Sequence, residues 1–375
     1  MPASPPLTFN DDLLLSDVDR KEIARSFPTF MHVLDFPELR QVFDGYDVSA
    51  NRWKKNLRRA GLTTIALGVI ALLGASTEPL YERLSPLFSN TIVVVSALAG
   101  LLSIIISTFG VLHSASKNRW LEARLMTERL RQFQFQTLVF RIPTILRCAP
   151  SPDFDAQFGK ARERWFSMFK MEHVDHLPGK LKEVLDDDPE EQFQLHDRDA
   201  LDGVPASDPL LTELFAAYRL LRIRHQILYA NFKLGGDSLN FPRKQVSLLS
   251  GVSLICILLV FFAHFAVSIS SVSRLLPSEA IANGLAFMRG TSVHVLIIWT
   301  VIVALAARTF EEGLQPTREV ERYTAYRARL GRLLYHFDEA STVPERVRIM
   351  TEVERLVYQE MREFLKTNYE ARFVL

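Results

Sequence analysis

The chain has few cysteines and no excess of either charge. Its 375 residues include two cysteines, Cys148 and Cys256, too few for a disulfide framework or a structural zinc site made of cysteines. There are 44 Lys and Arg against 43 Asp and Glu, so we do not expect the basic surface typical of nucleic-acid-binding proteins. Residues 1–10 contain three prolines and no basic segment, and we therefore expect no cleavable signal peptide.

Charge is missing altogether from four long apolar stretches. A helix that crosses a membrane needs about 20 mainly apolar residues. Helices buried in a soluble bundle are the alternative, but such helices rarely run for about 25 residues without a charge. The sequence therefore predicts an all-α membrane protein with four transmembrane helices in two hairpins and amphipathic cytoplasmic helices. The expected spans are about 60–77, 91–114, 246–272 and 291–307.

The distribution of basic residues predicts the orientation. Lys and Arg cluster beside one end of each span, whereas the two opposite loops hold Arg83, Arg274 and Arg289. Because cytoplasmic loops carry the excess of basic residues, we expect a multi-pass protein of the cell inner membrane with both termini cytoplasmic. A free Cys148 in a reducing compartment agrees with this orientation.

The two halves of the chain share a pattern that favours a tandem duplication. Phe43 and Tyr46 precede the first hairpin with the same spacing as Phe215 and Tyr218 before the second. The alternative is that any two amphipathic helices can be aligned in this way. After the hairpins, one helix face recurs exactly 200 residues later, with Ala123, Met126, Leu130, Phe133 and Thr137 matched by Tyr323, Tyr326, Leu330, Leu333 and Phe337.

Four consecutive segments follow from this pattern. Residues 1–40 form an N-terminal cytoplasmic segment, and residues 41–145 form the first membrane module. Residues 146–207 form a cytoplasmic helical insertion with an acidic, exposed linker at 186–208, and residues 208–375 form the second membrane module with C-terminal cytoplasmic helices.

Local signals predict several cytoplasmic helices. Ser16 with Asp19 three residues later is a helix start signal. Residues 117–141 are expected to form a strongly amphipathic helix that stops near Pro143. Apolar residues at helical spacing also predict helices at 154–169 and after Pro344.

No residue pattern points to catalysis. The chain has no Walker loop, no dinucleotide-binding glycine motif, no nucleophile elbow and no HExxH sequence. His173 and His176 are three residues apart and suggest a metal, but surface histidines explain this pair better. The acidic run Asp186–Asp188 is explained better by a solvated linker than by a cation site. We expect neither an enzyme nor a cofactor.

Polar and small residues inside the spans are the candidate functional residues. At about 100° per residue, the serines of the second span share one helix face, and those of the third span share another with His264. Such a face either packs against a neighbouring helix or lines a pore in an oligomer. An ionisable group within a span, here His264, is by default a functional candidate. The residues assigned to pore lining or helix packing are Ser96, Gly100, Ser103, Ser107, Ser250, Ser253, His264 and Ser268.

The sequence resembles one family of membrane proteins. The residues that carry the resemblance are Trp120-Leu-Glu-Ala-Arg124, Glu128-Arg-Leu-Arg-Gln-Phe133 and the paired Phe and Tyr before each hairpin. This pattern resembles the SLATT superfamily of prokaryotic two- and four-span membrane proteins, over residues 36–141 and 208–372. The resemblance implies a pore-forming effector of an immunity system and no catalytic residue. It also implies a cytoplasmic protein or a nucleotide-signalling module as a partner.

Two functions are consistent with these features. The first is an oligomeric, pore-forming or channel-like inner-membrane protein that depolarises or permeabilises the membrane on a cytoplasmic signal, with membrane lipid and further copies of itself as partners. The alternative is a non-conducting membrane scaffold whose cytoplasmic helices bind a partner protein. Neither function involves nucleic acid.

Overall fold

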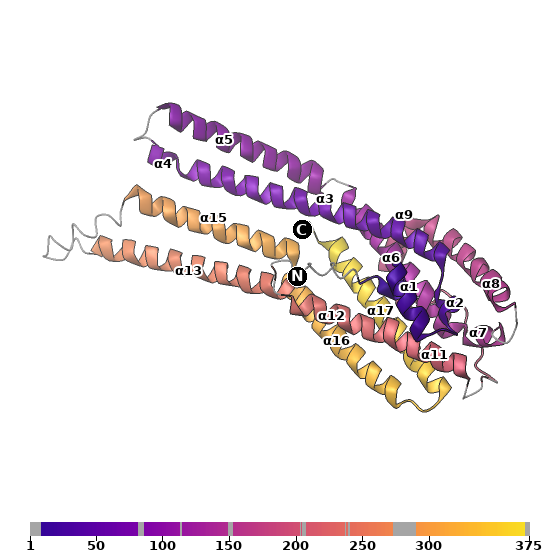
Figure 1. Cartoon of the computed structure of the whole chain (residues 1–375). Coiled ribbons are helices and arrows are strands. Elements are labelled where there is room, and N and C mark those ends of the chain that lie inside the picture. The colour runs from indigo at the N-terminus through magenta and orange to yellow at the C-terminus, as the bar shows by residue number, and fades with distance from the viewer. Residues whose placement is uncertain are drawn as a thin grey trace. The chain divides into compact units, whose positions relative to one another are not determined.

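Among the residues that it describes, the computed structural model contains helices joined by turns and loops and no strand, which confirms the all-α class (Figure 1). It describes residues 9–81, 86–112, 115–148, 153–202, 204, 208–236, 238, 241–272 and 290–371. The helices are η1 (Asp11–Leu13), α1 (Asp17–Ser26), α2 (Met31–Leu34), α3 (Pro37–Ser76), α4 (Glu78–Tyr81), α5 (Pro86–Ile105), η2 (Ile106–Leu112), α6 (Ser116–Phe140), α7 (Ile142–Cys148), α8 (Phe154–Phe169), η3 (Lys170–Val174), α9 (Leu177–Asp186), α10 (Pro189–Phe193), α11 (Pro209–Tyr218), η4 (Arg219–Arg224), α12 (His225–Gly235), α13 (Pro242–Val272), α15 (Thr291–Leu314), α16 (Pro316–Glu339) and α17 (Val343–Glu370).

The chain forms two compact units, each built from segments that are distant in the sequence. Unit 1 consists of Met1–Trp53, Asn118–Gly235 and Glu321–Glu370. Unit 2 consists of Lys54–Lys117, Gly236–Val320 and Ala371–Leu375. Unit 2 contains the apolar stretches of the sequence and unit 1 contains most of the charged helices.

Helix α6 is the centre of unit 1. From Leu125 to Phe140 every side chain is buried except that of Glu128, which is half-buried. The predicted bounds of this helix are confirmed to within a residue. Its predicted amphipathic character is wrong, because its polar side chains, such as Gln132 and Gln136, are enclosed and bond the backbone carbonyl of Phe193. A helix surrounded by others can keep polar residues where each finds a partner.

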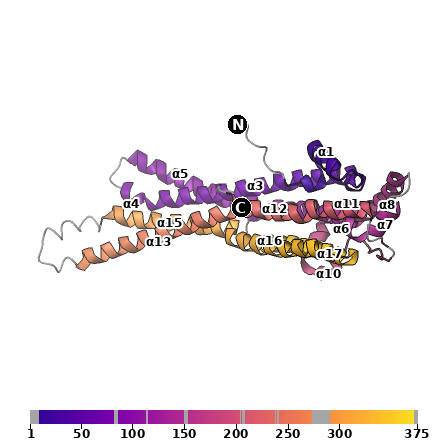
Figure 2. The same ribbon diagram turned by 60° about the horizontal axis from the view of Figure 1, so that its bottom comes forward.

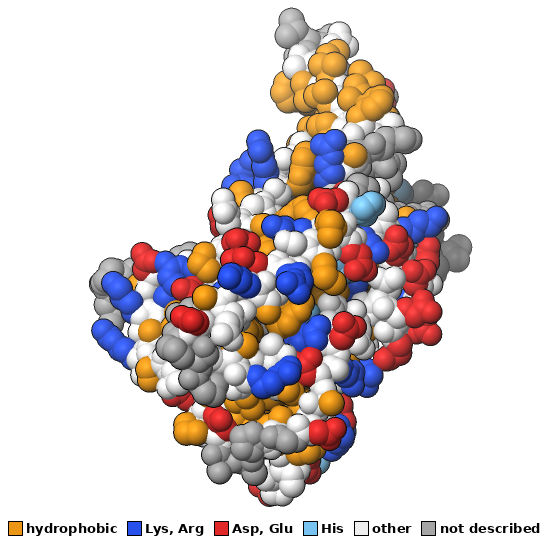
Figure 3. Space-filling model, turned by 90° about the vertical axis from the view of Figure 1, so that its right-hand side faces the viewer, with side chains coloured by type: hydrophobic (Ala, Val, Ile, Leu, Met, Phe, Trp, Pro, Cys, Tyr) orange, Lys and Arg blue, Asp and Glu red, His pale blue; other side chains and the backbone are white. Residues whose placement is uncertain are grey.

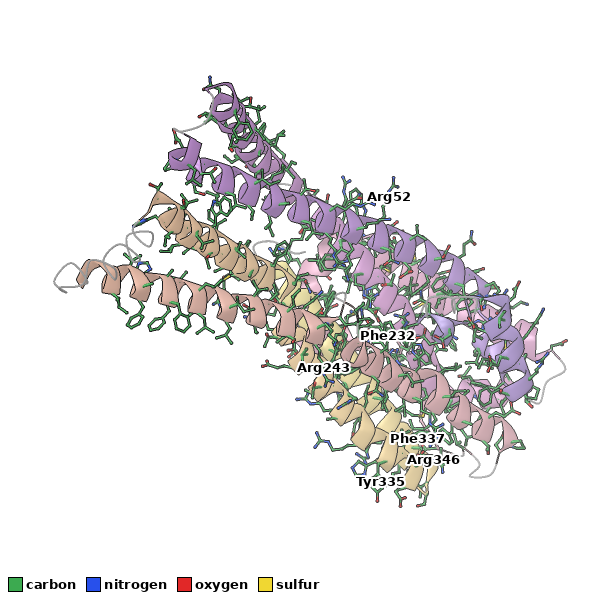
Figure 4. The ribbon with its side chains drawn as sticks, turned by 60° about the vertical axis from the view of Figure 1, so that its left-hand side comes forward. Arg52, Phe232, Arg243, Tyr335, Phe337 and Arg346 are labelled. Carbon is green, nitrogen blue, oxygen red and sulfur yellow. The ribbon has the colours of Figure 1, made fainter. Side chains whose placement is uncertain are left out.

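The other expected helices of unit 1 are present. The Ser16 hydroxyl accepts from the Asp19 N–H and the Asp19 carboxylate accepts from the Ser16 N–H, so the predicted start signal is a complete capping box for α1. Helix α17 begins at Val343, next to Pro344, and its apolar stripe includes buried Met350 and Val353. In Figure 4, Arg346 of α17 lies beside Phe337 of α16, with its guanidinium carbon 6.0 Å from the ring centre.

The segment that follows the acidic run is packed rather than exposed. Asp186 and Asp188 lie at the surface, as expected. Phe193 and His196, however, are buried, and Asp199 is held by Arg141 and Thr144 at 2.7 and 2.6 Å. The predicted exposed linker is therefore wrong for this part, because its apolar side chains cover α6.

Unit 2 contains the membrane-crossing candidates. Four helices are long and apolar enough to cross a membrane, namely α3, α5 with its continuation, α13 and the helix that starts at Thr291. Figures 1 and 2 show α3 beside α5 and α13 beside α15, in agreement with the contacts described below. On the face drawn in Figure 3, hydrophobic side chains gather in one region without Lys, Arg, Asp or Glu among them, as expected for a surface in lipid.

The first and fourth candidate helices differ in continuity. Helix α3 runs without a break over 40 residues, so the predicted first span is its apolar second half. Helix α15 ends at Leu314, where Gln315 adopts the left-handed conformation at φ 46°. Pro316 follows and starts α16. A left-handed residue and a proline together terminate a helix, so α15 and α16 are separate rods.

Candidate functional site

Two serines of the second span, Ser96 and Ser103, lie in the contact between α3 and α5. Ser96 is buried, and a Cβ added to Gly74 would overlap Ser96 Oγ and lie 2.9 Å from Ser96 Cβ. About two turns further along α5, Ser103 Oγ donates to the Thr64 carbonyl at 2.9 Å. Gly100 lies opposite Ala71, to which an added Cβ would come within 3.5 Å. These positions match the helix-packing alternative, in which small residues let two backbones approach and a serine hydroxyl bonds across the contact.

The end of this face departs from the α-helix that the sequence predicts. Residues Ile106–Leu112 form a π-helical segment, η2, which contains half-buried Ser107. Gly110 lies close to Ala60 of α3, so the small-residue contact continues into η2. A π-segment inserts a residue into the turn and rotates the following side chains, which helical spacing alone does not reveal. Ser114, which shares the predicted face, lies outside the described residues.

The polar residues of the third span divide between two faces of α13. Cys256 is buried and Ser253 is half-buried on the face along α15, where Val293, Thr300 and Ala307 are buried too. Ser250, His264 and Ser268 are exposed on the other face. Their exposed apolar neighbours at the same helical positions are Leu254, Ile257, Phe261 and Phe265. We call this set of seven residues the outer face of α13. Burial therefore separates Ser253 from Ser250, His264 and Ser268, with which helical spacing grouped it.

His264 is the only ionisable residue of the outer face. It lies about two thirds of the way along α13. No side chain among the described residues bonds its ring, and Ser268 Oγ donates to its backbone carbonyl at 2.9 Å. An imidazole on a surface in contact with lipid tails is unfavourable, because its N–H and its ring nitrogen lose their water.

Unit 1 contains buried charges that the sequence analysis missed. Arg222 donates from Nε and Nη2 to the two oxygens of Glu354 at 2.8 and 2.7 Å, and both residues are fully buried. The Tyr218 hydroxyl donates to the same carboxylate at 2.8 Å. Burial, and after it the negative charge of Glu354, raises the pKa of Tyr218 well above its usual value, so this hydroxyl keeps its proton. The available signal was Glu354 next to Val353 in an otherwise apolar stripe.

A second cluster holds the N-terminal segment. Arg131 Nε lies 2.8 Å from Asp12 Oδ2, and Arg131 and Arg124 flank Glu128 at 3.0 and 2.6 Å. Burial raises the pKa of Glu128, but the two arginines outweigh burial and hold it at about 2. His225 Nε2 lies 2.9 Å from Asp11 Oδ1. These charges attach η1 to α6 and α12.

The two histidines that suggested a metal do not form a site. His173 is buried against the Phe169 ring, whose centre lies 4.8 Å from its own, while exposed His176 bonds the Met171 carbonyl. Burial, and then the charge of Arg129, lowers the pKa of His173 to about 3. Within the described ranges, no group of three His, Cys, Asp or Glu side chains is placed to hold a metal ion.

His196 makes a testable contribution to pH dependence. It is buried, its Nε2 lies 2.9 Å from Thr137 Oγ1, and burial lowers its pKa to about 4. The unfolded chain takes up a proton near pH 6.5, but the folded chain does not, so stability is lost as the pH falls from 6.5 towards 4. Between pH 7.5 and pH 5, we expect the free energy of unfolding to fall by about 2 kcal/mol less in His196→Gln than in the wild-type protein. Chemical unfolding of the full chain in detergent at the two pH values measures this difference. An equal fall in the free energy of unfolding in the wild-type protein and in His196→Gln would contradict this role of His196.

The comparisons with known proteins give no relative. No protein-family model matches the chain, and neither a curated protein nor a solved structure matches it.

Proposed function

We propose that the protein is an oligomeric, channel-like protein of a bacterial inner membrane that permeabilises the membrane on a cytoplasmic signal. The observation that carries this proposal is the outer face of α13, where Ser250, His264 and Ser268 are exposed in a helix apolar enough to cross the membrane. A second copy that covers this face removes the polar side chains from lipid. A ring of copies brings one imidazole and two hydroxyls per chain towards a shared axis.

The proposal includes the arrangement of the chain in the membrane. The pairs α3–α5 and α13–α15 are two transmembrane hairpins and parallel repeats of one unit, with unit 1 and both termini in the cytoplasm. The excess of Lys and Arg at one end of each span supports this orientation. Unit 1 then receives the signal from a protein or nucleotide-signalling partner, as in the SLATT family that the sequence resembles.

A different observation favours the alternative of a membrane scaffold. Ser96, Gly100 and Ser103 are engaged between α3 and α5 within one chain, which leaves them unable to line a pore in this arrangement. A scaffold needs only tightly packed hairpins and a partner-binding unit 1. The two functions therefore differ in the role of α13, and His264 is the residue that separates them.

The test uses purified protein in liposomes loaded with a fluorescent dye sensitive to ion flux. We expect the wild-type protein to conduct and His264→Leu to lower the flux at least tenfold, because leucine replaces the polar group on the shared axis. Phe262→Leu is the matched control, because Phe262 is 60% exposed on α13 but lies about 100° from the outer face. We expect this variant to conduct as the wild-type protein does.

Cross-linking of the same liposomes reports assembly. The channel proposal is contradicted if the wild-type protein forms oligomers but conducts no ions, even when cell extract is added as a source of the signal. That result would support the scaffold. Equal flux through the wild-type protein and His264→Leu would show that the outer face of α13 does not line the path.

A further inference from the structure

One buried arginine of unit 1 has no carboxylate partner among the described residues. Arg129 of α6 is 2% exposed, and its Nη1 donates to Gln132 Oε1 at 2.8 Å. Its Nη2 is buried and donates to no acceptor among the described residues. The other enclosed arginines of this core differ, since Arg222 is paired with Glu354 and Arg131 with Asp12. Among the described residues, the charge of Arg129 is thus compensated by an amide oxygen and an aromatic face.

A second donor without an acceptor lies beside it. The Arg129 guanidinium carbon is 5.2 Å from the centre of the Tyr358 ring. Tyr358 of α17 is 2% exposed, and its hydroxyl is buried without a hydrogen-bond partner in the described chain. Two unused donors on facing helices favour an acceptor between them, and a negatively charged one also offsets the charge of the guanidinium.

The described surroundings of Arg129 and Tyr358 are aromatic and supply no buried carboxylate. Phe193 packs on Tyr358 with ring centres 5.8 Å apart. Burial lowers the pKa of His173 most, and the nearby charges of Arg129 and then Lys180 lower it further. The acidic neighbour, Glu172, is 66% exposed and therefore well solvated. A buried charge without a carboxylate partner is costly, and the cost is larger than that of a buried ion pair because no opposite charge offsets it.

We propose that Arg129 and Tyr358 bind a small monovalent anion of the size of chloride between α6 and α17. Its single charge matches the single uncompensated guanidinium. Its small size and weak hydration suit a site closed by aromatic rings, whereas a phosphate needs more donors than these two residues offer. The anion ties α6 to α17, so the stability of unit 1 rises with anion concentration. This inference does not depend on the proposed channel function.

The experiment follows thermal unfolding of the full chain in detergent while sodium chloride replaces sodium gluconate at constant ionic strength. Gluconate is too large for the closed site. We expect the melting temperature of the wild-type protein to rise by roughly 5 °C and then to saturate. Arg129→Met removes the charge, so its melting temperature is independent of chloride and, in gluconate, equals or exceeds that of the wild type.

Two further variants keep the test decisive. Tyr358→Phe removes one donor and retains the charge of Arg129. The chloride concentration at which the rise in melting temperature is half complete is therefore about tenfold higher. Arg348→Met, which removes an arginine that is 63% exposed, keeps the full chloride response. A wild-type melting temperature that does not differ between chloride and gluconate would overturn the proposal and assign the two donors to buried water. An unchanged response in Tyr358→Phe would overturn it as well.

Discussion

Replacement of Glu354 by alanine is expected to lower the free energy of unfolding by about 3–5 kcal/mol. The substitution leaves Arg222 fully buried and charged, and it removes one of the two acceptors of the Tyr218 hydroxyl, which keeps the Met350 carbonyl. For a unit of this size the melting temperature falls by roughly 10 °C. Differential scanning fluorimetry of the full chain in detergent measures this shift.

A matched control separates the buried charge from the loss of packing. In the triple variant Tyr218→Phe, Arg222→Met and Glu354→Met, no polar group of the cluster remains unpaired, and apolar side chains fill a similar volume. Replacement of a buried ion pair as a whole is often neutral, so we expect this variant to recover most of the stability. A loss below about 1 kcal/mol in Glu354→Ala alone would mean that water reaches Arg222.

The second large effect concerns the contact between α3 and α5. Gly74→Leu is expected to cost about 3 kcal/mol or more, because even a methyl group at this position would overlap Ser96. Leucine forces the two helices apart and stretches the bond from Ser103 Oγ to the Thr64 carbonyl. Unfolding by increasing fractions of a denaturing detergent measures the loss, followed by circular dichroism.

Two controls test the mechanism. Gly251→Leu in α13 makes the same change at a glycine with no atom within 4 Å of an added Cβ, so it leaves stability nearly unchanged. In Gly74→Ala the smaller clash is relieved by Ser96→Gly, so the double variant is more stable than Gly74→Ala alone. Independent effects of these two substitutions would contradict a direct contact between positions 74 and 96.

Local and compositional features of the fold could be predicted from the sequence. The absence of charge identified the four long apolar helices, because exclusion of charged residues is a property of each segment by itself. The capping box of Ser16 was predictable for the same reason, since the two partners lie three residues apart.

Features that depend on a distant partner could not be predicted. Helical spacing placed Ser96 and Ser103 on one face but could not say which helix covers that face. It also grouped Ser253 with His264, although the position of α15 separates them by burial. In the sequence, Arg222 and Arg131 cannot be distinguished from solvated arginines. Their partners, Glu354 and Asp12, are more than 100 residues away from them along the chain.

The contrast between α3 and α15 has a mechanical consequence. An unbroken helix resists bending and twisting, so a turn applied to the polar half of α3 reaches its apolar half as the same turn. Gln315 marks a break between two helices. Its left-handed conformation interrupts the hydrogen-bond ladder, and Pro316 has no N–H with which to restore it. Bending is therefore expected at Gln315, between α15 and α16, whereas α3 has no residue at which its hydrogen-bond ladder is interrupted.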